Sequence, residues 1–224
     1  RSVGLIAPYL GYMRQDTRFH RGEAVSTPLF AQFLEEAFDW LVTVDPHLHR
    51  VERLQSLYSI PTVHVSATPA VARWIAETVP DAVLIGPDSE SEQWVADIAA
   101  LSSMPYQVLA KERHGDYDVR VSLPDPAAVA GRTPVLIDDI VSSGHTILET
   151  LAHLRRLSLP SPLLVAIHPV FAGDAYARLQ EAGLARIVST DTISHPSNAI
   201  ALGADLAAAA STLMTASTDS PEDP

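Results

Sequence analysis

Two adjacent carboxylates followed by a turn of small residues are the most chemically suggestive feature of the sequence. The apolar run 135–137 leads into Asp138 and Asp139, and the turn Ser142-Ser143-Gly144 precedes the apolar positions of a helix. A small-residue turn at a helix start presents successive backbone amides to an anion, and the helix dipole adds to the attraction. Two neighbouring carboxylates could accept hydrogen bonds from vicinal hydroxyls or hold a divalent metal. The segment therefore predicts a pocket for a sugar phosphate.

A purely structural interpretation of the same segment is a strand, a turn and a capped helix. Thr146 and Glu149 have the T-x-x-E spacing of a capping box. A capping box would explain the start of the helix, but it does not explain the two acids ahead of it. We therefore prefer the functional interpretation.

Strands and helices alternate along the chain, which predicts an α/β fold with mostly parallel sheets covered on both faces. Strands are expected at 3–7, 41–44, 62–65, 82–85, 134–137, 163–167 and 187–189, and residues 106–110 and 118–123 are expected to form the arms of a hairpin. Helices are expected from Thr27-Pro28, at 68–78, 91–101, 147–157 and 175–182, and at 204–214. In such folds ligands bind beyond the carboxyl ends of the strands, so residues that end strands are candidate site residues.

A change in composition near 66–69 predicts a domain junction. We expect one domain over 1–66, a second over 67–214, and a disordered tail over 215–224, which has no large apolar residue. The first residues predict a strand that is entered abruptly and without an initiator Met. We therefore expect that the chain lacks its natural beginning.

Composition narrows the functional classes. The chain has 224 residues and a net charge of −12, which argues against a nucleic-acid surface, because phosphate backbones are held by clustered Lys and Arg. It has no cysteine, which excludes disulfides, zinc fingers, thiol nucleophiles and iron–sulfur clusters and fits a reducing cytoplasm. No apolar run approaches about 20 residues, so no membrane span is predicted.

The acidic pair and its turn closely resemble the phosphoribosyl pyrophosphate signature shared by type I phosphoribosyltransferases and ribose-phosphate pyrophosphokinases. The resemblance implies that Asp138 and Asp139 face the ribose hydroxyls. It also implies that the 5-phosphate is wrapped by Ser142, Ser143, Gly144, His145 and Thr146. His145 stands where these families often have glycine, and Ser142 where they frequently have an acid; neither change removes a backbone donor.

Two further segments, each with a cationic side chain, resemble the pyrophosphokinases in particular. Arg14-Gln15-Asp16 is similar to the segment that contacts ATP, and the planar cation of Arg14 could stack on a base or bind phosphate. Lys111 and Arg113 lie in a segment similar to the flexible catalytic loop, at the tip of the expected hairpin, which implies that they meet charge developing on the transferred phosphates. The alternative for both segments is a solvated, charged turn.

Two strand ends resemble the magnesium ligands of the pyrophosphokinases. His47 belongs to an Asp-x-His segment that begins at Asp45, and Asp88 to a Pro-Asp pair. The resemblance makes both residues ligands of the Mg²⁺ that accompanies ATP, although a histidine is unusual for this ion. The glycines that usually follow the Pro-Asp pair are replaced by residues 89–92, and Trp94 stands where a basic residue is common. A Pro-Asp pair that only makes a turn is the alternative.

The resemblance extends over residues 4–213, and the segments 168–171 and 190–193 are part of it. It implies two phosphoribosyltransferase-like domains, the first incomplete, in a transferase of nucleotide biosynthesis. The implied reaction is transfer of pyrophosphate from ATP to the anomeric hydroxyl of ribose 5-phosphate, with Mg²⁺ as cofactor. A homo-oligomer is implied too, because the family's ATP site spans subunits. Two alternatives stay open: a type I phosphoribosyltransferase that consumes phosphoribosyl pyrophosphate, and a catalytically silent regulatory homologue of the synthetase.

Overall fold

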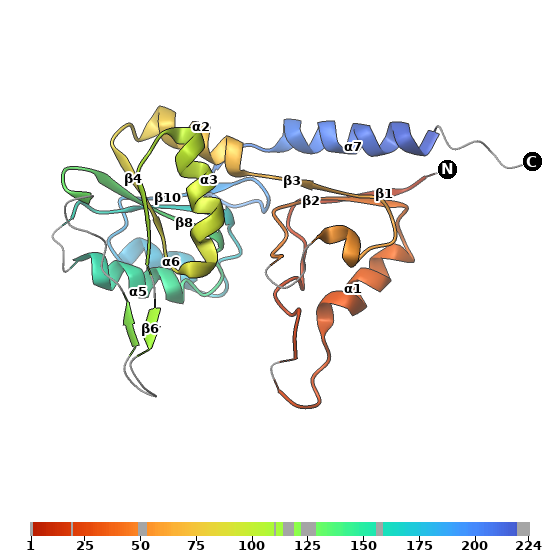
Figure 1. Cartoon of the computed structure of the whole chain (residues 1–224), viewed down its shortest axis with the longest axis horizontal. Helices are drawn as coiled ribbons and strands as arrows, with labels where there is room; N and C mark the ends of the chain where they lie inside the picture. The colour runs from red at the N-terminus through yellow and green to blue at the C-terminus, as the bar shows by residue number, and fades with distance from the viewer. Residues whose placement is uncertain are drawn as a thin grey trace, which may run out of the picture. The chain divides into compact units, whose positions relative to one another are not determined.

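The computed structural model describes residues 2–18, 20–48, 53–109, 111–113, 119–121, 129–155 and 159–218. At 111–113, 119–121 and 216–218 it describes the backbone only. The chain divides into two compact units (Figure 1). The second unit comprises Ala67–Ala201, and the first comprises the described residues on either side of it. The chain therefore leaves the first unit after Ser66 and returns to it at Leu202.

The first unit is built on a parallel sheet in the order β1-β2-β3. Its strands are β1 (Gly4–Ala7), β2 (Trp40–Val44) and β3 (Thr62–Val65), and its helices are α1 (Ser26–Glu35), the short 3₁₀ helix η1 (Leu54–Ser56) and α7 (Gly203–Thr218). The central strand β2 is buried along its whole length because α1 and α7 cover opposite faces of the sheet (Figure 1). On the α1 side, Ala31 and Leu34 pack against Leu41.

Two expectations for this unit need correction. The first helix was expected to begin at Thr27-Pro28, but α1 begins at Ser26 and Thr27 lies in its first turn, where its hydroxyl donates to the Tyr12 carbonyl (2.8 Å). The closing helix was expected in the second domain, but α7 packs on β2 and β3 and belongs to the first unit. Residues 215–218 are the last turn of α7 rather than part of the tail, and 219–224 lie outside the described residues.

The second unit is built on a sheet whose described strands follow the order β11-β10-β9-β8-β4-β5, with every neighbouring pair parallel. These strands are β4 (Ala82–Gly86), β5 (Tyr106–Val108), β8 (Thr133–Ile140), β9 (Leu163–His168), β10 (Arg186–Thr190) and β11 (Asn198–Ile200). The helices are α2 (Thr68–Thr78), the short 3₁₀ helix η2 (Ser89–Ser91), α3 (Glu92–Ser102), α5 (His145–Leu154) and α6 (Ala175–Glu181).

The core of the second unit lies between the central strands and the helices. On one face, Ile147 and Leu151 of α5 and Leu179 of α6 pack against Leu136 and Leu164 of the sheet. Helices α2 and α3 pack on each other. The buried stretch of β8 alternates between the two faces of the sheet, so the continuous apolar run that precedes the acids is the sequence pattern of a central parallel strand. The α/β fold with parallel sheets flanked by helices is confirmed.

The second arm of the expected hairpin is present, but the first arm lies further along the chain than expected. Residues 106–108 form β5, which pairs in parallel with β4. The antiparallel pair is β6 (Lys111–Arg113) with β7 (Val119–Val121). Lys111 and Arg113 therefore lie in the first arm of the hairpin rather than at its tip. Alternation of apolar and polar residues marks a strand but does not identify its partner, which explains the error.

The order of the strands identifies where a ligand would bind. From β4 the chain moves outward to β5, whereas from β8 it moves in the opposite direction through β9 and β10. Such a switch point opens a crevice at the carboxyl ends of the two strands between which the direction reverses. In this unit these strands are β4 and β8. No helix within the described ranges combines the length and the apolar character that crossing a membrane requires.

Candidate active site

The acidic pair lies at the carboxyl end of β8, beside the switch point. The strand was expected to end at Ile137, but it continues through Asp138 and Asp139 to Ile140, so the two acids belong to the end of the strand itself. Both are half-buried. Asp138 is in register with Ala166 of β9, and one carboxylate oxygen of Asp139 accepts a hydrogen bond from the Ile140 amide (2.7 Å). Successive side chains of a strand point to opposite faces, so the two carboxylates leave β8 in different directions.

The turn after β8 is bonded to the loop that follows β9. The amide of Val141 donates to the His168 carbonyl (3.1 Å), the amide of Phe171 to the Val141 carbonyl (2.8 Å), and the amide of Ala172 to the Ser142 carbonyl (3.1 Å). In a trans peptide the carbonyl and the following amide point in opposite directions. Anchoring these two carbonyls therefore turns the next two amides away from the loop.

Those two amides and that of Gly144 are available to a ligand. Within the part of the chain that the structure describes, no hydrogen bond takes up the amides of Ser142, Ser143 or Gly144. They stand immediately before α5, a helix of ten residues whose dipole also favours an anion at this end. The turn therefore has the donors and the electrostatics of a phosphate site.

Gly144 is required by both the conformation and the packing of this turn. Its φ is +70°, and a Cβ added to it would lie 3.0 Å from Cδ1 of Leu179 on α6. Gly144 is also the N-cap of α5, so the helix begins at His145 and the Thr146 capping box expected from the sequence does not cap it. Glu149 instead accepts from the exposed His145 ring, with 3.2 Å between Nε2 and Oε1.

The loop after β4 forms the other side of the switch point. Asp88 is half-buried and caps η2, because its Oδ1 accepts from the Glu90 amide (3.1 Å). The hydroxyl of Ser91 donates to the Asp88 carbonyl (2.6 Å) and occupies the space that any side chain at Gly86 would need. The serine-rich segment thus folds into a tight 3₁₀ turn that keeps Asp88 at the carboxyl end of β4.

His47 follows β2 in the first unit. The chain turns at Asp45, whose φ of +29° is unusual for a residue with a side chain. Its amide donates to the Val65 carbonyl (3.1 Å), and its Oδ1 bonds Nε2 of His64 (2.8 Å). This bonded turn leads to His47, which is half-buried.

The segment Arg14-Gln15-Asp16 precedes α1. Arg14 and Gln15 are exposed and Asp16 is half-buried. Gln15 is tied to the start of α1, because its carbonyl accepts from the Thr27 amide (3.2 Å) and its Oε1 from the Ser26 hydroxyl (2.6 Å). A cavity of about 440 Å³ adjoins this segment and is lined by Gln15, Thr17, His20, Glu23, Ala24 and Ser26.

The structure brings only some of the predicted site residues together. The turn residues Ser142 to Thr146 follow the acidic pair after only two intervening residues, whereas His47 and Asp88 belong to different units. The side chains of Lys111 and Arg113 lie outside the described residues. Where side chains are described, no group of three or more His, Asp or Glu gathers as a metal cage.

Comparison with known proteins decides the family. The phosphoribosyl transferase domain matches residues 65–204. The ribose-phosphate pyrophosphokinase of Methanopyrus kandleri is 32% identical over 210 residues, which cover 93% of this chain and 71% of the relative. That of Methanobrevibacter smithii is 30% identical over 219 residues, with 92% and 72% covered. This chain belongs to the ribose-phosphate pyrophosphokinase family.

The fold agrees with the family. The crystal structure of phosphoribosylpyrophosphate synthetase from Mycobacterium smegmatis superposes with a TM-score of 0.78 at 25% identity, and the match covers 98% of this chain and 72% of that chain. The match extends over both units. The resemblance that separate sequence segments indicated is therefore confirmed for nearly the whole chain.

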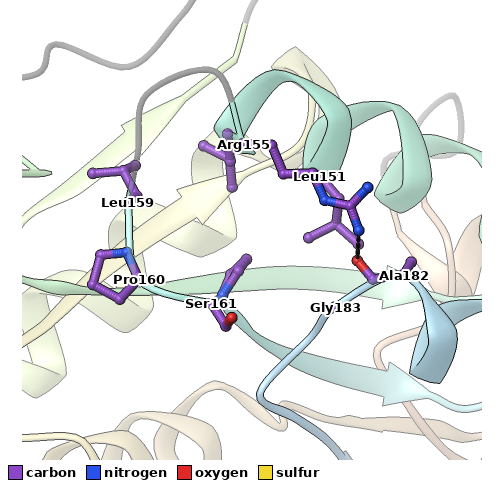
Figure 2. A pocket seen from close by; sticks show the side chains of 9 residues that line it. Leu151, Arg155, Leu159, Pro160, Ser161, Ala182 and Gly183 are labelled. Atoms are coloured by element: carbon purple, nitrogen blue, oxygen red, sulfur yellow. Dashed lines mark hydrogen bonds between the residues drawn. The ribbon is translucent and has the colours of Figure 1, made fainter.

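A second pocket lies in the second unit, away from the turn at 142–144 (Figure 2). It measures about 160 Å³ and lies at the far end of α5, where the Arg155 guanidinium donates to the Ala182 carbonyl (2.6 Å). The lining is Leu151, Leu154, Arg155, Leu159, Pro160, Ser161, Pro162, Ala182 and Gly183. Because α5 separates it from the turn at 142–144, we assign it no part in the candidate active site.

The sequence analysis missed the residues that hold the turn at 142–144. The segment 168–171 was included in the family resemblance, but no role was assigned to it. Its part emerges only from the bonds that His168, Phe171 and Ala172 make to the turn. Such bonds join positions about thirty residues apart, and no local pattern in the sequence encodes them.

Proposed function

We propose that this pyrophosphokinase transfers the pyrophosphoryl group of ATP to the anomeric hydroxyl of ribose 5-phosphate, giving phosphoribosyl pyrophosphate and AMP. The observation that carries the proposal is the turn at 142–144. Its amides, to which no described residue is hydrogen-bonded, stand at the start of α5, shortly after two half-buried carboxylates and at the switch point of the sheet. A pentose with a phosphate at one end and vicinal hydroxyls at the other has the matching chemistry.

The sugar would be bound by this turn and the acidic pair. The amides of Ser142, Ser143 and Gly144 would donate to the 5-phosphate, and the first turn of α5, with His145 and Thr146, would surround it. The carboxylates of Asp138 and Asp139 would accept hydrogen bonds from the ribose hydroxyls. This arrangement orients the anomeric hydroxyl, and orientation accounts for a large share of the rate enhancement in phosphoryl transfer.

The transfer itself is a displacement at the β-phosphorus of ATP. A bond forms between the anomeric oxygen and this phosphorus, and the bond to the oxygen shared with the α-phosphate breaks. AMP leaves with that oxygen, and the hydroxyl proton is released. Arg14, Gln15 and Asp16 would hold ATP, and the cations of Lys111 and Arg113 would stabilise the negative charge that develops on the phosphates.

The donor set suits Mg²⁺ as the cofactor. This ion is commonly bound through one or two carboxylates together with water and substrate phosphates. Asp88 offers a carboxylate at the carboxyl end of β4, where its Oδ1 accepts from the Glu90 amide. The resemblance to the family implies that His47 and Asp88 would hold the ion, and a bound divalent cation would supply neutralisation of negative charge on the ATP phosphates.

We also infer a cytoplasmic homo-oligomer. A chain without cysteine suits a reducing compartment, and the resemblance to the family implies an ATP site that needs a neighbouring subunit. Size-exclusion chromatography with light scattering measures the mass of the assembly. A strictly monomeric chain that is fully active would contradict this inference.

Phosphorus NMR tests the reaction. The purified chain is mixed with ATP, Mg²⁺ and ribose 5-phosphate, and the expected result is a new sugar-linked diphosphate together with an equal amount of AMP. Release of pyrophosphate from phosphoribosyl pyrophosphate in the presence of a nucleobase, with no need for ATP, would instead identify a phosphoribosyltransferase. Binding of ribose 5-phosphate without any turnover, together with association with an active homologue, would identify a regulatory subunit.

A lysine variant tests the assignment of the catalytic loop. Lys111 is the only lysine in the chain. Lys111→Ala is expected to lower turnover by about a hundredfold or more, while ribose 5-phosphate still binds in calorimetry. Arg73→Ala, which removes an exposed cation from α2, is the matched control and is expected to keep both properties. Release of AMP by Lys111→Ala at the wild-type rate would refute the assignment.

A further inference from the structure

The turn at 142–144, here called the phosphate turn, is anchored by a loop that contains a residue in an unusual backbone conformation. Phe171 has a φ of +37°, in the left-handed region that residues with side chains seldom adopt. Its amide makes the shortest of the bonds to the turn, 2.8 Å to the Val141 carbonyl. The direction of this amide depends on the backbone angles of Phe171, so whatever keeps Phe171 in place also keeps the turn in place.

Two other rings hold the side chain of Phe171. The ring centroid of His195 lies 4.7 Å from that of Phe171, and the ring centroid of Tyr176 lies 5.1 Å from it. Tyr176 and His195 contact each other edge to face at 4.5 Å. Each ring therefore touches the other two, at separations where aromatic rings attract one another. Phe171 is buried in this cluster.

The ring of His195 is itself fixed by its own loop. Its Nδ1 accepts from the Ser197 amide (3.2 Å) and also contacts the Ser197 hydroxyl (2.8 Å), while the backbone amide of His195 donates to Oδ1 of Asn198 (2.8 Å). An amide can donate only to a nitrogen that carries a lone pair, so the hydrogen bonds assign the proton to Nε2 and make the ring neutral. Burial lowers the pKa of His195, which favours the same neutral form.

We propose that His195 is a positioning residue for the phosphate turn and acts through Phe171. The loop after β10 holds the His195 ring, the ring holds Phe171 at its positive φ, and Phe171 with Ala172 turns the amides of Ser142 and Ser143 toward the ligand. That this ligand is ribose 5-phosphate rests on the proposed function. The positioning itself is a property of the chain without any ligand.

Two variants of His195 separate its contributions. His195→Ala removes both the ring and the Nδ1 acceptor, whereas His195→Phe keeps a ring against Phe171 and removes only the acceptor. His153→Ala, at the other end of α5, is the matched control. Hydrogen exchange followed by mass spectrometry reports on the amides of Phe171 and Ala172, and calorimetry reports on the affinities for ribose 5-phosphate and for ATP.

The expected result is selective. In His195→Ala the amides of Phe171 and Ala172 exchange about tenfold faster, and ribose 5-phosphate binds about tenfold more weakly, while ATP affinity is unchanged. His195→Phe lies between this variant and the wild type, and His153→Ala matches the wild type. Unchanged exchange in His195→Ala would overturn the proposal, and so would an equal loss of affinity for both substrates, which indicates a general structural role.

The two proposals fail in different ways. If wild-type protein does not bind ribose 5-phosphate, the proposed function fails, and the exchange data on the same variants still decide whether His195 positions the turn. If wild-type protein binds and converts the sugar but exchange in His195→Ala is unchanged, the function stands and the positioning role is refuted.

Discussion

Replacing Gly144 with alanine tests whether the phosphate turn packs closely against Leu179 of α6. Two costs are expected from the structure. The first is the left-handed φ of +70°, which costs an alanine about 1–2 kcal/mol. The second is the contact of the new Cβ with Leu179 Cδ1 at 3.0 Å, which must displace a fully buried side chain and costs about 1–3 kcal/mol. The sum is about 2–5 kcal/mol, a large part of a typical folding free energy.

Gly131 provides the control because it shares only the first cost. Its φ is +72°, but an added Cβ would meet no atom within 4 Å. Urea denaturation followed by circular dichroism should therefore show a loss of about 1–2 kcal/mol for Gly131→Ala and a clearly larger loss for Gly144→Ala. Calorimetry should show weaker binding of ribose 5-phosphate only for Gly144→Ala, because only this change moves the turn.

Equal losses of stability in the two alanine variants would refute the reasoning. That result would mean that the Leu179 side chain moves aside at no cost, and that the turn is not supported by α6. Combining Gly144→Ala with Leu179→Val provides a further check. A shorter side chain at 179 should recover part of the loss, as a favourable coupling in a double-mutant cycle.

Three further predictions concern packing and pH. Gly86→Ala should lower the melting temperature because its Cβ would overlap the Ser91 hydroxyl, and Ser91→Ala in the same chain should restore part of the loss. Hydrogen bonds from Ser59 lower the pKa of Glu35 from its ordinary 4.5, so the carboxylate stabilises the fold above that pH and loses this contribution as the pH falls through the lowered value. Melting temperatures between neutral and acid pH should consequently fall less steeply in Glu35→Gln; an identical slope would contradict this. Burial, with a smaller contribution from the Glu35 charge, raises the pKa of Tyr58 to about 12, so one tyrosine should ionise near that pH in ultraviolet difference spectra and be missing from Tyr58→Phe.

Local sequence patterns correctly predicted the elements that are determined by neighbouring residues. The Thr-Pro pair at Thr68 and the apolar spacing that follows it predicted a helix over 68–78, and α2 has these bounds. The apolar run before Asp138 predicted a buried strand, and β8 includes it. The small residues 142–144 predicted a turn between the strand and the next helix, and the chain turns there, with a positive φ at Gly144. Side-chain type at neighbouring positions is enough to encode these features.

Features that depend on distant partners could not be predicted in the same way. The strand at 106–108 pairs with β4 rather than with the segment that follows it, and α7 returns to the first unit. The bond between Phe171 and the turn joins two loops that only the sheet brings together. Even the start of α5 was misjudged, because the left-handed Gly144 ends the turn before Thr146 could cap the helix. In each case the tertiary contact overrides a plausible local signal.

The return of the chain to its first unit has a consequence for biosynthesis. Domains usually fold in the order in which the ribosome releases them. Here the middle segment, Ala67–Ala201, holds its whole sheet in one stretch and can fold as soon as it emerges. The three strands made before it must wait with one face uncovered until α7 is translated. The first unit is therefore completed only after the second, and during that delay the uncovered face of its sheet is exposed to other proteins in the cell.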